Sequence, residues 1–507
     1  MTLQSFGLGG RQQQQAILIE NCRLLSQEDP SGLVSGDILV VGNIIEAIGK
    51  AGTLRAPDDV LCHTLTGENV LAVAGMINAH THSPENILKA ALPSMPVEIW
   101  GLALYNDYIA WTPQLTYLSA LAGALEMLKT GTTAVLDHHW TVVGVSAEHL
   151  NAVMQAYHDC GIRATVAPFL EDRDLLLEAG ERYGVSFPAH PYVDRFDNWV
   201  PLEEQFAVIE QFMQNWHGGA GGRLRGMPGP VGIQWCSPDL LHSCLEIAQK
   251  YQVGMHLHAL ETQFQANMVE KMLGKKGLQF LQDEGALKAG TSLAHAIWLE
   301  PGDLSLLAQT QTTVVHNPIS NLRLGSGRFQ LEEAIQQGVH VALGSDGSAS
   351  NDTQNMFEVL KMTGLVHNQA HIPYKRWPRP AQIIEMATHA GALALGYQHE
   401  LGRLAPGQLA DIVLLDLLDS SFLPLHEPLL HLVYGKPDTA VDSVIVNGQL
   451  VLEHKKSTYI DESALYEEIR RTCQPAWPGI QAFINMTPAT GEVIASFQKL
   501  YQFGGGH

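Results

Sequence analysis

The amino-acid sequence predicts an α/β fold in which a (β/α)8 barrel of the TIM type is joined to a small composite β-sandwich domain. Three observations favour this fold. The chain has 507 residues, more than the roughly 250 that a bare barrel needs. Its middle alternates short apolar runs with helical patterns, as a parallel barrel does. Both ends instead carry short β-type segments separated by Gly and Asn turns.

The two β-rich ends predict one sheet domain built from both termini. AILIENCRLL and SGDILVVGNIIEAIG lie near the N-terminus, and GRLAPGQLADIVLLDL and VDSVIVNGQLVLEHK lie near the C-terminus. We therefore expect residues 16–70 and 399–460 to form the two parts of the composite β domain. Residues 461–507 are predicted to form a C-terminal helical extension and tail.

The middle of the chain, residues 71–398, predicts the barrel. The expected strands lie near residues 73–79, 132–137, 164–169, 231–236, 253–259, 292–297, 312–316 and 339–344. One helix is expected to begin at Thr112 with proline at its first position, another to follow Ser237, and a third to span 330–338. Residues 170–230 exceed a minimal β/α unit and predict an insertion with a loop.

Composition excludes several classes of function. The formal charge of −22 repels polyphosphate, so a nucleic-acid polymer is not an expected partner. No uninterrupted apolar run reaches the roughly 18 residues of a membrane span, and the N-terminus lacks the order of a signal peptide. The six cysteines form no CxxC pair. We expect a cytoplasmic protein whose partner is a small molecule.

The segment GMINAHTHSPE, residues 75–85, contains the first chemical signal. His80 and His82 stand at i and i+2, so on a strand both imidazoles face one cavity and can hold one cation. With 23 histidines in the chain, about one such pair is expected by chance. Taken alone, the pair fits two histidines on a half-exposed strand equally well.

Later strand ends add further candidates. VGMHLHALET predicts His258 as a third ligand and Glu261 as an acid/base group, with His256 packed one layer deeper in the barrel. His295 ends TSLAHAIWL, where a buried core histidine is the competing interpretation. Asp346 follows an apolar strand, where an isolated carboxylate is costly unless it binds a partner, although an Asx turn is the alternative. Three imidazoles and a carboxylate predict an open zinc-type site, which iron(II) could also occupy.

The motifs GMINAHTH, HLHALET, LAHAIWL, HNPISNLRLGSG and LGSDGSASND follow one another in this order. Together they resemble the aminohydrolases of the amidohydrolase superfamily, in the mononuclear branch with triazine hydrolases, guanine deaminases and S-adenosylhomocysteine/methylthioadenosine deaminases. The resemblance covers nearly the whole chain, including GRLAPGQLADIVLLD of the composite sheet domain. It implies homo-oligomerisation as well.

The resemblance implies one divalent metal, zinc with iron as the alternative, held by His80, His82, His258 and Asp346. Glu261, His295 and Asp346 match the catalytic residues of the family. The expected fourth strand ends QWCSPDL without a lysine, which argues against a dinuclear site. The implied reaction is hydrolytic deamination of an amino-substituted purine, pyrimidine, pterin or triazine, with release of ammonia.

Candidate substrate contacts are Glu85, Trp100, His138, Trp140 and Asn321, each of which also has a structural interpretation as a loop or packing residue. Alternative activities are triazine dechlorination or alkylamine release, and deimination of a formimino amino acid. The last would need a cationic clamp for a carboxylate, with Arg163, Arg173 and Arg323 as candidates. A non-catalytic barrel that only binds a ligand is the alternative from another class.

Overall fold

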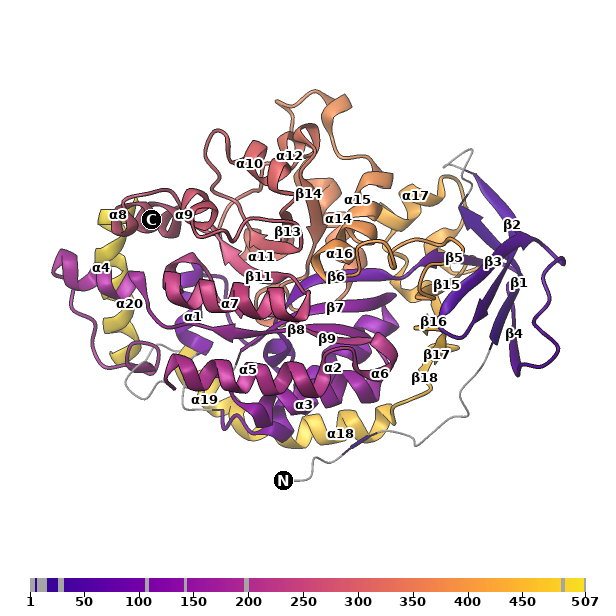
Figure 1. Ribbon diagram of the computed structural model, residues 1–507, viewed down its shortest axis with the longest axis horizontal. Helices are drawn as coiled ribbons and strands as arrows, with labels where there is room; N and C mark the ends of the chain where they lie inside the picture. The colour runs from indigo at the N-terminus through magenta and orange to yellow at the C-terminus, as the bar shows by residue number, and fades with distance from the viewer. Residues whose placement is uncertain are drawn as a thin grey trace.

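A computed structural model describes residues 5–6, 16–25, 32–104, 109–140, 144–195, 200–484 and 488–505. The barrel occupies the middle of the molecule, and a β-sheet stands at one end of it (Figure 1). The C-terminal helices, yellow in Figure 1, return along the outside of the barrel to its other end. This arrangement confirms the predicted barrel with an added β region.

Two parallel sheets form the barrel. The strands of the first half are β6 (Met76–Thr81), β7 (Thr132–His139), β8 (Arg163–Leu170), β9 (Leu224–Gly226) and β10 (Gly229–Pro230). Those of the second half are β11 (Met255–Ala259), β12 (Thr291–His295), β13 (Thr313–His316) and β14 (His340–Leu343). The halves join where His258 N donates to Val231 O (3.0 Å) and where Asp346 N donates to His80 O (3.0 Å).

The predicted fourth strand is misplaced. The chain is extended at β9 and β10, whereas Ile233–Trp235, inside the expected 231–236 strand, forms a 3-10 turn. Ile233 and Cys236 are nevertheless buried, so the turn is as apolar as a strand. An apolar run alone does not distinguish the two conformations. The expected fourth strand has no lysine at its end. Residues 223–236, which include β9 and β10, contain no lysine either.

Helices surround the strands on the outside (Figure 1). The longer ones are α1 (Val97–Leu104), α2 (Pro113–Lys129), α3 (Ala147–Cys160), α4 (Leu175–Tyr183), α5 (Leu202–Trp216), α7 (Pro238–Tyr251), α8 (Gln263–Leu273), α9 (Gly277–Asp283), α10 (Asp303–Thr310), α11 (Pro318–Arg323), α12 (Leu331–Gln337), α14 (Met356–Val366), α15 (Pro380–Met386), α16 (His389–Ala394), α18 (Glu462–Cys473), α19 (Trp477–Ile484) and α20 (Pro488–Gly504).

Local signals placed three of these helices correctly. Thr112 caps α2 by accepting from Leu115 N, and Ser237 caps α7 in the same way from Leu240 N. Helix α12 ends at Gly338 in the left-handed conformation that favours glycine. Residues 170–230, expected as an insertion with a loop, contain the helices α4 and α5 and loop segments, but they end with β9 and β10, which belong to the barrel.

Strands from both ends of the chain share a single sheet. Their hydrogen-bonded order is β18-β17-β16-β15-β5-β1-β2-β3, with β4 paired to β1. The bounds are β1 (Ala16–Leu25), β2 (Leu33–Val41), β3 (Ile44–Lys50), β4 (Cys62–Thr66), β5 (Val70–Ala74), β15 (Ile412–Asp416), β16 (Val441–Val446), β17 (Gln449–Glu453) and β18 (Lys456–Ser457). An irregularity in β1 between Ile19 and Cys22 lets it pair with β4 first and β5 later.

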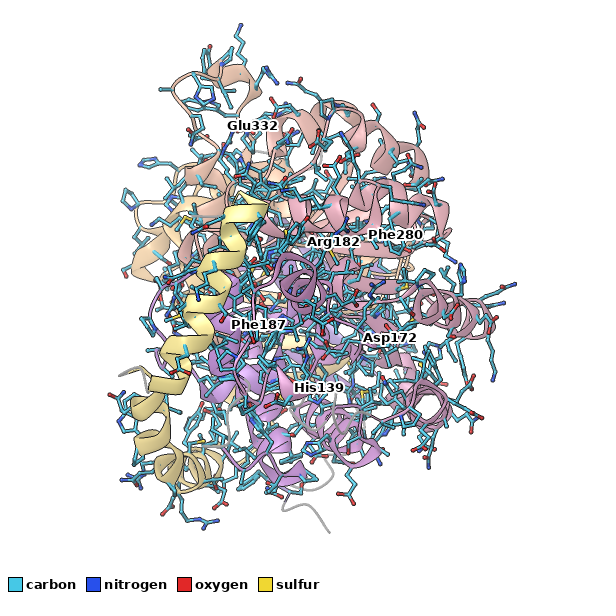
Figure 2. The ribbon with its side chains drawn as sticks, turned by 90° about the vertical axis from the view of Figure 1, so that its left-hand side faces the viewer. His139, Asp172, Arg182, Phe187, Phe280 and Glu332 are labelled. Carbon is cyan, nitrogen blue, oxygen red and sulfur yellow. The ribbon has the colours of Figure 1, made fainter. Side chains whose placement is uncertain are left out.

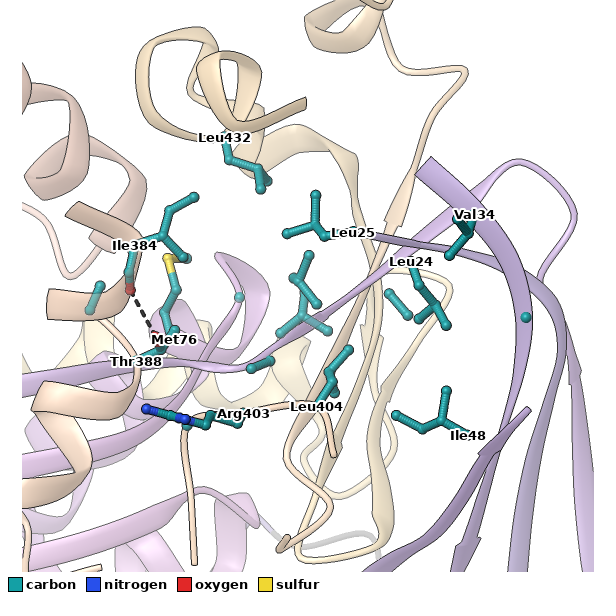
Figure 3. Close-up of a pocket in the computed structure, with 18 of the residues that line it drawn as sticks. Leu24, Leu25, Val34, Ile48, Met76, Ile384, Thr388, Arg403, Leu404 and Leu432 are labelled. Atoms are coloured by element: carbon teal, nitrogen blue, oxygen red, sulfur yellow. Dashed lines mark hydrogen bonds between the residues drawn. The ribbon is translucent and has the colours of Figure 1, made fainter. Parts of the chain in front are cut away.

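A cavity of about 890 Å³ separates this sheet from the barrel. Figure 3 shows Leu24, Val34 and Ile48 of the sheet on one side, and Met76 and Ile384 of the barrel on the other. The sheet leads directly into the first residues of β6, so the cavity lies at the N-terminal ends of the barrel strands. Catalytic groups of such barrels gather at the opposite ends. Among the described residues, no helix is long and apolar enough to cross a membrane.

Candidate metal centre and active site

Four side chains converge at the C-terminal ends of the barrel strands. His80 and His82 belong to the end of β6, His258 lies on β11, and Asp346 follows β14. The Nε2 atoms of His80 and His82 lie 3.4 and 3.3 Å from Asp346 Oδ1, and His258 Nε2 lies 3.4 Å from His82 Nε2. All four side chains are buried. Nitrogen and oxygen donors at this spacing suit one divalent ion.

The other ring nitrogens of these histidines are already bound. His82 Nδ1 donates to His138 O (2.7 Å), and His258 Nδ1 donates to Val231 O (2.6 Å). Because a carbonyl oxygen only accepts, both Nε2 atoms keep a lone pair for a metal. His80 Nδ1 meets His256 Nε2 at 2.8 Å, which places His256 one layer deeper, as predicted.

The hydrogen bonding of His80 shows whether the residues present suit a bound metal. Its Nε2 atom is buried and makes no hydrogen bond within the part of the chain that the structure describes. A buried polar atom without a partner is costly. A cation between His80, His82 and Asp346 would satisfy it, and their donor atoms all lie within 4.8 Å of one another. The residues present therefore fit a divalent metal.

Two further titratable groups face the ligands. His295 Nε2 lies 3.8 Å from Asp346 Oδ2 and 3.9 Å from Glu261 Oε2. Asn321 Oδ1 holds His295 Nδ1 at 2.8 Å, and Ser326 Oγ donates to Glu261 Oε1 at 3.1 Å. An acid, an imidazole and a carboxylate thus line one edge of the metal position, which is the arrangement that general acid–base catalysis needs.

The backbone is strained where these groups leave the barrel. His295 has a φ of 71° and Asp346 a φ of 64°, both in the left-handed region that non-glycine residues rarely adopt. Such strain costs about 1–3 kcal/mol per residue and clusters at functional sites. Gly347 is required next to Asp346, since a Cβ there would collide with the carboxylate of Glu85.

Burial sets the protonation of the carboxylates. Burial raises the pKa of Glu261, and the charges of Asp346 and Glu98 add to this effect, while His295 opposes it. Burial also raises the pKa of Glu85, to about 7. Burial alone would raise the pKa of Asp346, but the contacts with His80 and His82 outweigh it and hold this pKa well below its usual value. The site therefore raises the pKa of Glu261 and lowers that of Asp346, so the two neighbouring carboxyl groups are driven apart in acidity.

A cavity of about 120 Å³ opens above these groups. Three of the candidate substrate contacts, Glu85, Trp100 and Trp140, line it, and Trp140 Nε1 donates to Glu85 Oε1 (3.3 Å). The other two candidates lie outside the described lining. Asn321 contacts His295, and the ring of His138 stacks on His258 at 4.9 Å with its Nε2 3.2 Å from Gly229 O.

A profile of the amidohydrolase family matches residues 71–451. The chain belongs to the amidohydrolase family. Its relatives include the 5-methylthioadenosine/S-adenosylhomocysteine deaminase of Pelotomaculum thermopropionicum, 29% identical over 90% of this chain and 97% of that protein. The 5′-deoxyadenosine deaminase of Methanosphaera stadtmanae is 29% identical over 89% of this chain and 97% of its own length.

Solved structures of the family superpose on the chain. The zinc complex of atrazine chlorohydrolase from Arthrobacter aurescens has a TM-score of 0.80 at 27% identity and covers 90% of this chain and all of its own. An adenosine deaminase from Xanthomonas campestris with bound zinc has a TM-score of 0.78 at 22% identity, which supports the fold alone. The predicted family, including its triazine hydrolase and deaminase branch, is confirmed.

The three arginines considered for a carboxylate clamp are bound to acidic residues elsewhere in the structure. Arg163 pairs with Asp411 (2.8 Å) at the start of β8, Arg173 pairs with Glu178, and Arg323 pairs with Asp352. None of them lines the described pocket. The guanidinium that does line it is that of Arg195, which contacts Asp174 (2.7 Å) and Glu171 (3.2 Å).

Sequence reasoning missed several pocket residues. The missed residues are Glu98, Phe169, Glu171, Tyr192, Arg195, Trp235 and Gln265. Phe169 lies near the C-terminal end of β8, and the others lie on helices or loops between strands. Glu98 lies on α1 close to Trp100, which was a candidate substrate contact. Its closeness to Trp100 was therefore a signal that could have predicted Glu98 as a pocket residue. The remaining positions carry no motif, because only tertiary packing brings them to the metal ligands.

Proposed function

We propose that this amidohydrolase catalyses the metal-dependent hydrolytic deamination of an amino-substituted heterocycle, with release of ammonia. The observation that carries the proposal is the cluster of Glu261, His295 and Asp346, the last a proposed metal ligand, in a tryptophan-lined pocket. Relatives named as deaminases support the choice of a C–N bond as the one that is broken.

His80, His82, His258 and Asp346 would hold a single divalent ion. Zinc is proposed because structures of related proteins contain it, and iron(II) is the alternative for the same donors. When bound, such an ion lowers the pKa of a coordinated water to roughly 7, which supplies a nucleophile at neutral pH.

The protein residues divide the proton transfers. Asp346, held ionised, accepts the proton of the attacking water. Glu261, whose pKa is raised by burial, acts in its protonated form: it donates to a ring nitrogen of the substrate and makes the neighbouring carbon more electrophilic. Asn321 Oδ1 orients the His295 ring through Nδ1, and Nε2 donates a hydrogen bond to the developing oxyanion when both ring nitrogens carry a proton. Asp346 then passes the proton that it accepted to the amino group, which leaves as ammonia, while the new hydroxyl returns a proton to Glu261 as the carbonyl forms.

The proposed substrate is a 6-aminopurine nucleoside with a modified 5′ position, as the names of the relatives suggest. Trp100 and Trp140 offer flat surfaces for the ring, and Glu85 offers acceptors for an exocyclic amine. Hydrolysis of a triazine is the second candidate, favoured by the structural similarity to atrazine chlorohydrolase. A formimino amino acid lacks support because the pocket arginine is already paired with acidic groups.

Several sequence predictions stay part of this proposal. They are a cytoplasmic location, a homo-oligomeric assembly, the exclusion of nucleic-acid polymers, and the division into residues 16–70, 71–398, 399–460 and 461–507. The nine-stranded sheet and the C-terminal helices are the structural features on which this division rests.

Ammonia release from the purified, zinc-loaded protein tests the proposal. The panel contains 5′-deoxyadenosine, methylthioadenosine, guanine, aminopyrimidines, pterins, aminotriazines and formimino amino acids, each with a chelated control. The expected result is chelator-sensitive ammonia from the adenine nucleosides. Chloride or alkylamine from a triazine would select the second candidate. Metal binding without turnover on any compound would select the ligand-binding interpretation instead.

A further inference from the structure

The C-terminal helix α20 lies beyond the residues that the family profile matches, which end at 451. It packs against α1, α4 and α8, which contribute Glu98, Leu176 and Gln265 to the pocket lining. Val493, Phe497 and Leu500 are fully buried, and their spacing of four and three residues makes one apolar face. Figure 2 shows the yellow helix running past Phe187, whose ring lies 4.9 Å from that of Phe497.

A chain of hydrogen bonds leads from α20 to the catalytic edge of the pocket. Tyr501 Oη donates to Glu98 Oε2 (3.2 Å), and Thr262 Oγ1 donates to Glu98 Oε1 (2.6 Å). Thr262 follows Glu261 directly and caps α8 by accepting from Gln265 N (3.1 Å). The carboxylate of Glu98 therefore connects the C-terminal helix to the turn that carries the proposed acid.

Aromatic contacts hold the same helix close. The ring of Tyr501 meets Phe264 edge-on at 4.7 Å, and Phe497 lies 6.2 Å from the pocket residue Tyr192. Gly504 touches Phe264 so closely that a Cβ at this position would collide with the ring. Helix α20 is thus packed against the pocket wall without room to shift.

We propose that Tyr501 is a positioning residue of the active site, acting through Glu98 and Thr262 on Glu261. Glu98 is buried, so an oxygen that loses its hydroxyl donor is left poorly solvated, and the carboxylate reorients. Because the hydroxyl of Thr262 is bound to the same carboxylate, Thr262 moves when the carboxylate of Glu98 moves. The turn at Glu261 is then displaced together with Thr262. The catalytic part of this inference rests on the proposed function, whereas its structural part does not.

The test compares Tyr501→Phe with Ser496→Ala in the full-length, zinc-loaded protein. Both substitutions remove one hydrogen bond of α20, since Ser496 Oγ donates to Ser186 O (2.8 Å). Only Tyr501→Phe removes a hydrogen bond to Glu98. Hydrogen–deuterium exchange of residues 260–268 and zinc content are measured without any substrate, and kcat and KM are then measured with 5′-deoxyadenosine.

In Tyr501→Phe, exchange at 260–268 is expected to accelerate by at least about fivefold, because one buried hydrogen bond is lost. The value of kcat falls by about tenfold while KM stays within about threefold, because a misplaced acid slows chemistry more than binding. Ser496→Ala is expected to match the unaltered protein in both measurements. If Tyr501→Phe does not fold, Glu98→Gln replaces it, since an amide accepts only one of the two hydroxyl bonds.

Unchanged exchange in Tyr501→Phe, or an equal acceleration in both variants, would overturn the proposal and leave α20 as a structural brace. Absence of deamination by the unaltered protein would instead contradict the proposed function. The exchange comparison would still decide the inference in that case, because it requires no turnover.

Discussion

Both ends of the barrel bury charged groups, but the groups at the two ends differ in their contacts and in their backbone conformation. At the N-terminal end, Arg163 meets Asp411 through two hydrogen bonds of 2.9 and 2.8 Å, and Asn447 bonds to both residues. At the C-terminal end, His80 Nε2 makes no described hydrogen bond, and Asp346 adopts a left-handed backbone. Arg163 Nη1 also makes no described hydrogen bond. The two ends differ because the Arg163–Asp411 ion pair supports the fold, whereas the strained backbone at Asp346 and the donor atoms clustered around it suit a metal and a reaction.

The comparison predicts that substitutions at the two ends separate activity from stability. Asp346→Ala removes both a metal ligand and the proposed base, so activity should fall by at least about 10⁴-fold. Metal content should drop from one ion per chain to a small fraction. Metal analysis and ammonia assays measure both effects, and full zinc occupancy in this variant would remove Asp346 from the ligand set.

Glu261→Gln should separate chemistry from metal binding at the same end. The amide cannot donate the proton that the ring nitrogen needs, so kcat should fall by about 10³-fold. Zinc should stay near one per chain because Glu261 is not a proposed ligand. Loss of zinc in this variant would make Glu261 a ligand and contradict its role as the acid.

At the opposite end, Arg163→Met should affect stability and leave catalysis intact. Asp411 would remain buried without its guanidinium, which costs about 3–5 kcal/mol in the free energy of unfolding. Denaturant unfolding measures this loss, and kcat per folded molecule should stay within about twofold of the unaltered protein. A matched control is Arg163→Met combined with Asp411→Leu, which removes both charges and should recover part of the stability.

The smallest expected effect concerns pH. Glu261 acts when protonated, and its raised pKa means that activity is present below this pKa and lost as the pH rises through it. Asp346 keeps a pKa well below its usual value, so it stays ionised over the same range. Ser326 Oγ donates to the Glu261 carboxylate, and this hydrogen bond lowers the pKa of Glu261. Ser326→Ala should therefore move the alkaline limb of the kcat profile to higher pH, and a shift to lower pH would assign that limb to another group.

Candidate residues for the metal end could be named from the sequence because their chemistry is local to strand ends. His80 lies on β6 and His82 directly follows it in extended conformation, and Asp346 follows an apolar run, so each position had a signal of its own. Parallel strands then bring these ends together in any closed barrel. The order of the motifs identified the family, and the donor atoms of His80, His82 and Asp346 lie within 4.8 Å of one another.

The pocket wall could not be predicted in the same way. Glu98 and Tyr501 are 403 residues apart in the chain, and only the packing of α20 on α1 brings them into contact. Arg163 and Arg195 look alike in the sequence, yet the first lies at the start of β8 and the second lines the pocket. The apolar run at 231–236 was mistaken for a strand because its side chains are buried within a turn.

A zinc titration of the metal-free protein tests the central claim most directly. Ammonia release from 5′-deoxyadenosine is followed as zinc is added to a known amount of chain. The account predicts that activity rises linearly and stops rising at one zinc per chain, with His80, His82, His258 and Asp346 as the single site. Activity that is independent of zinc, or that rises until two equivalents are bound, would contradict it.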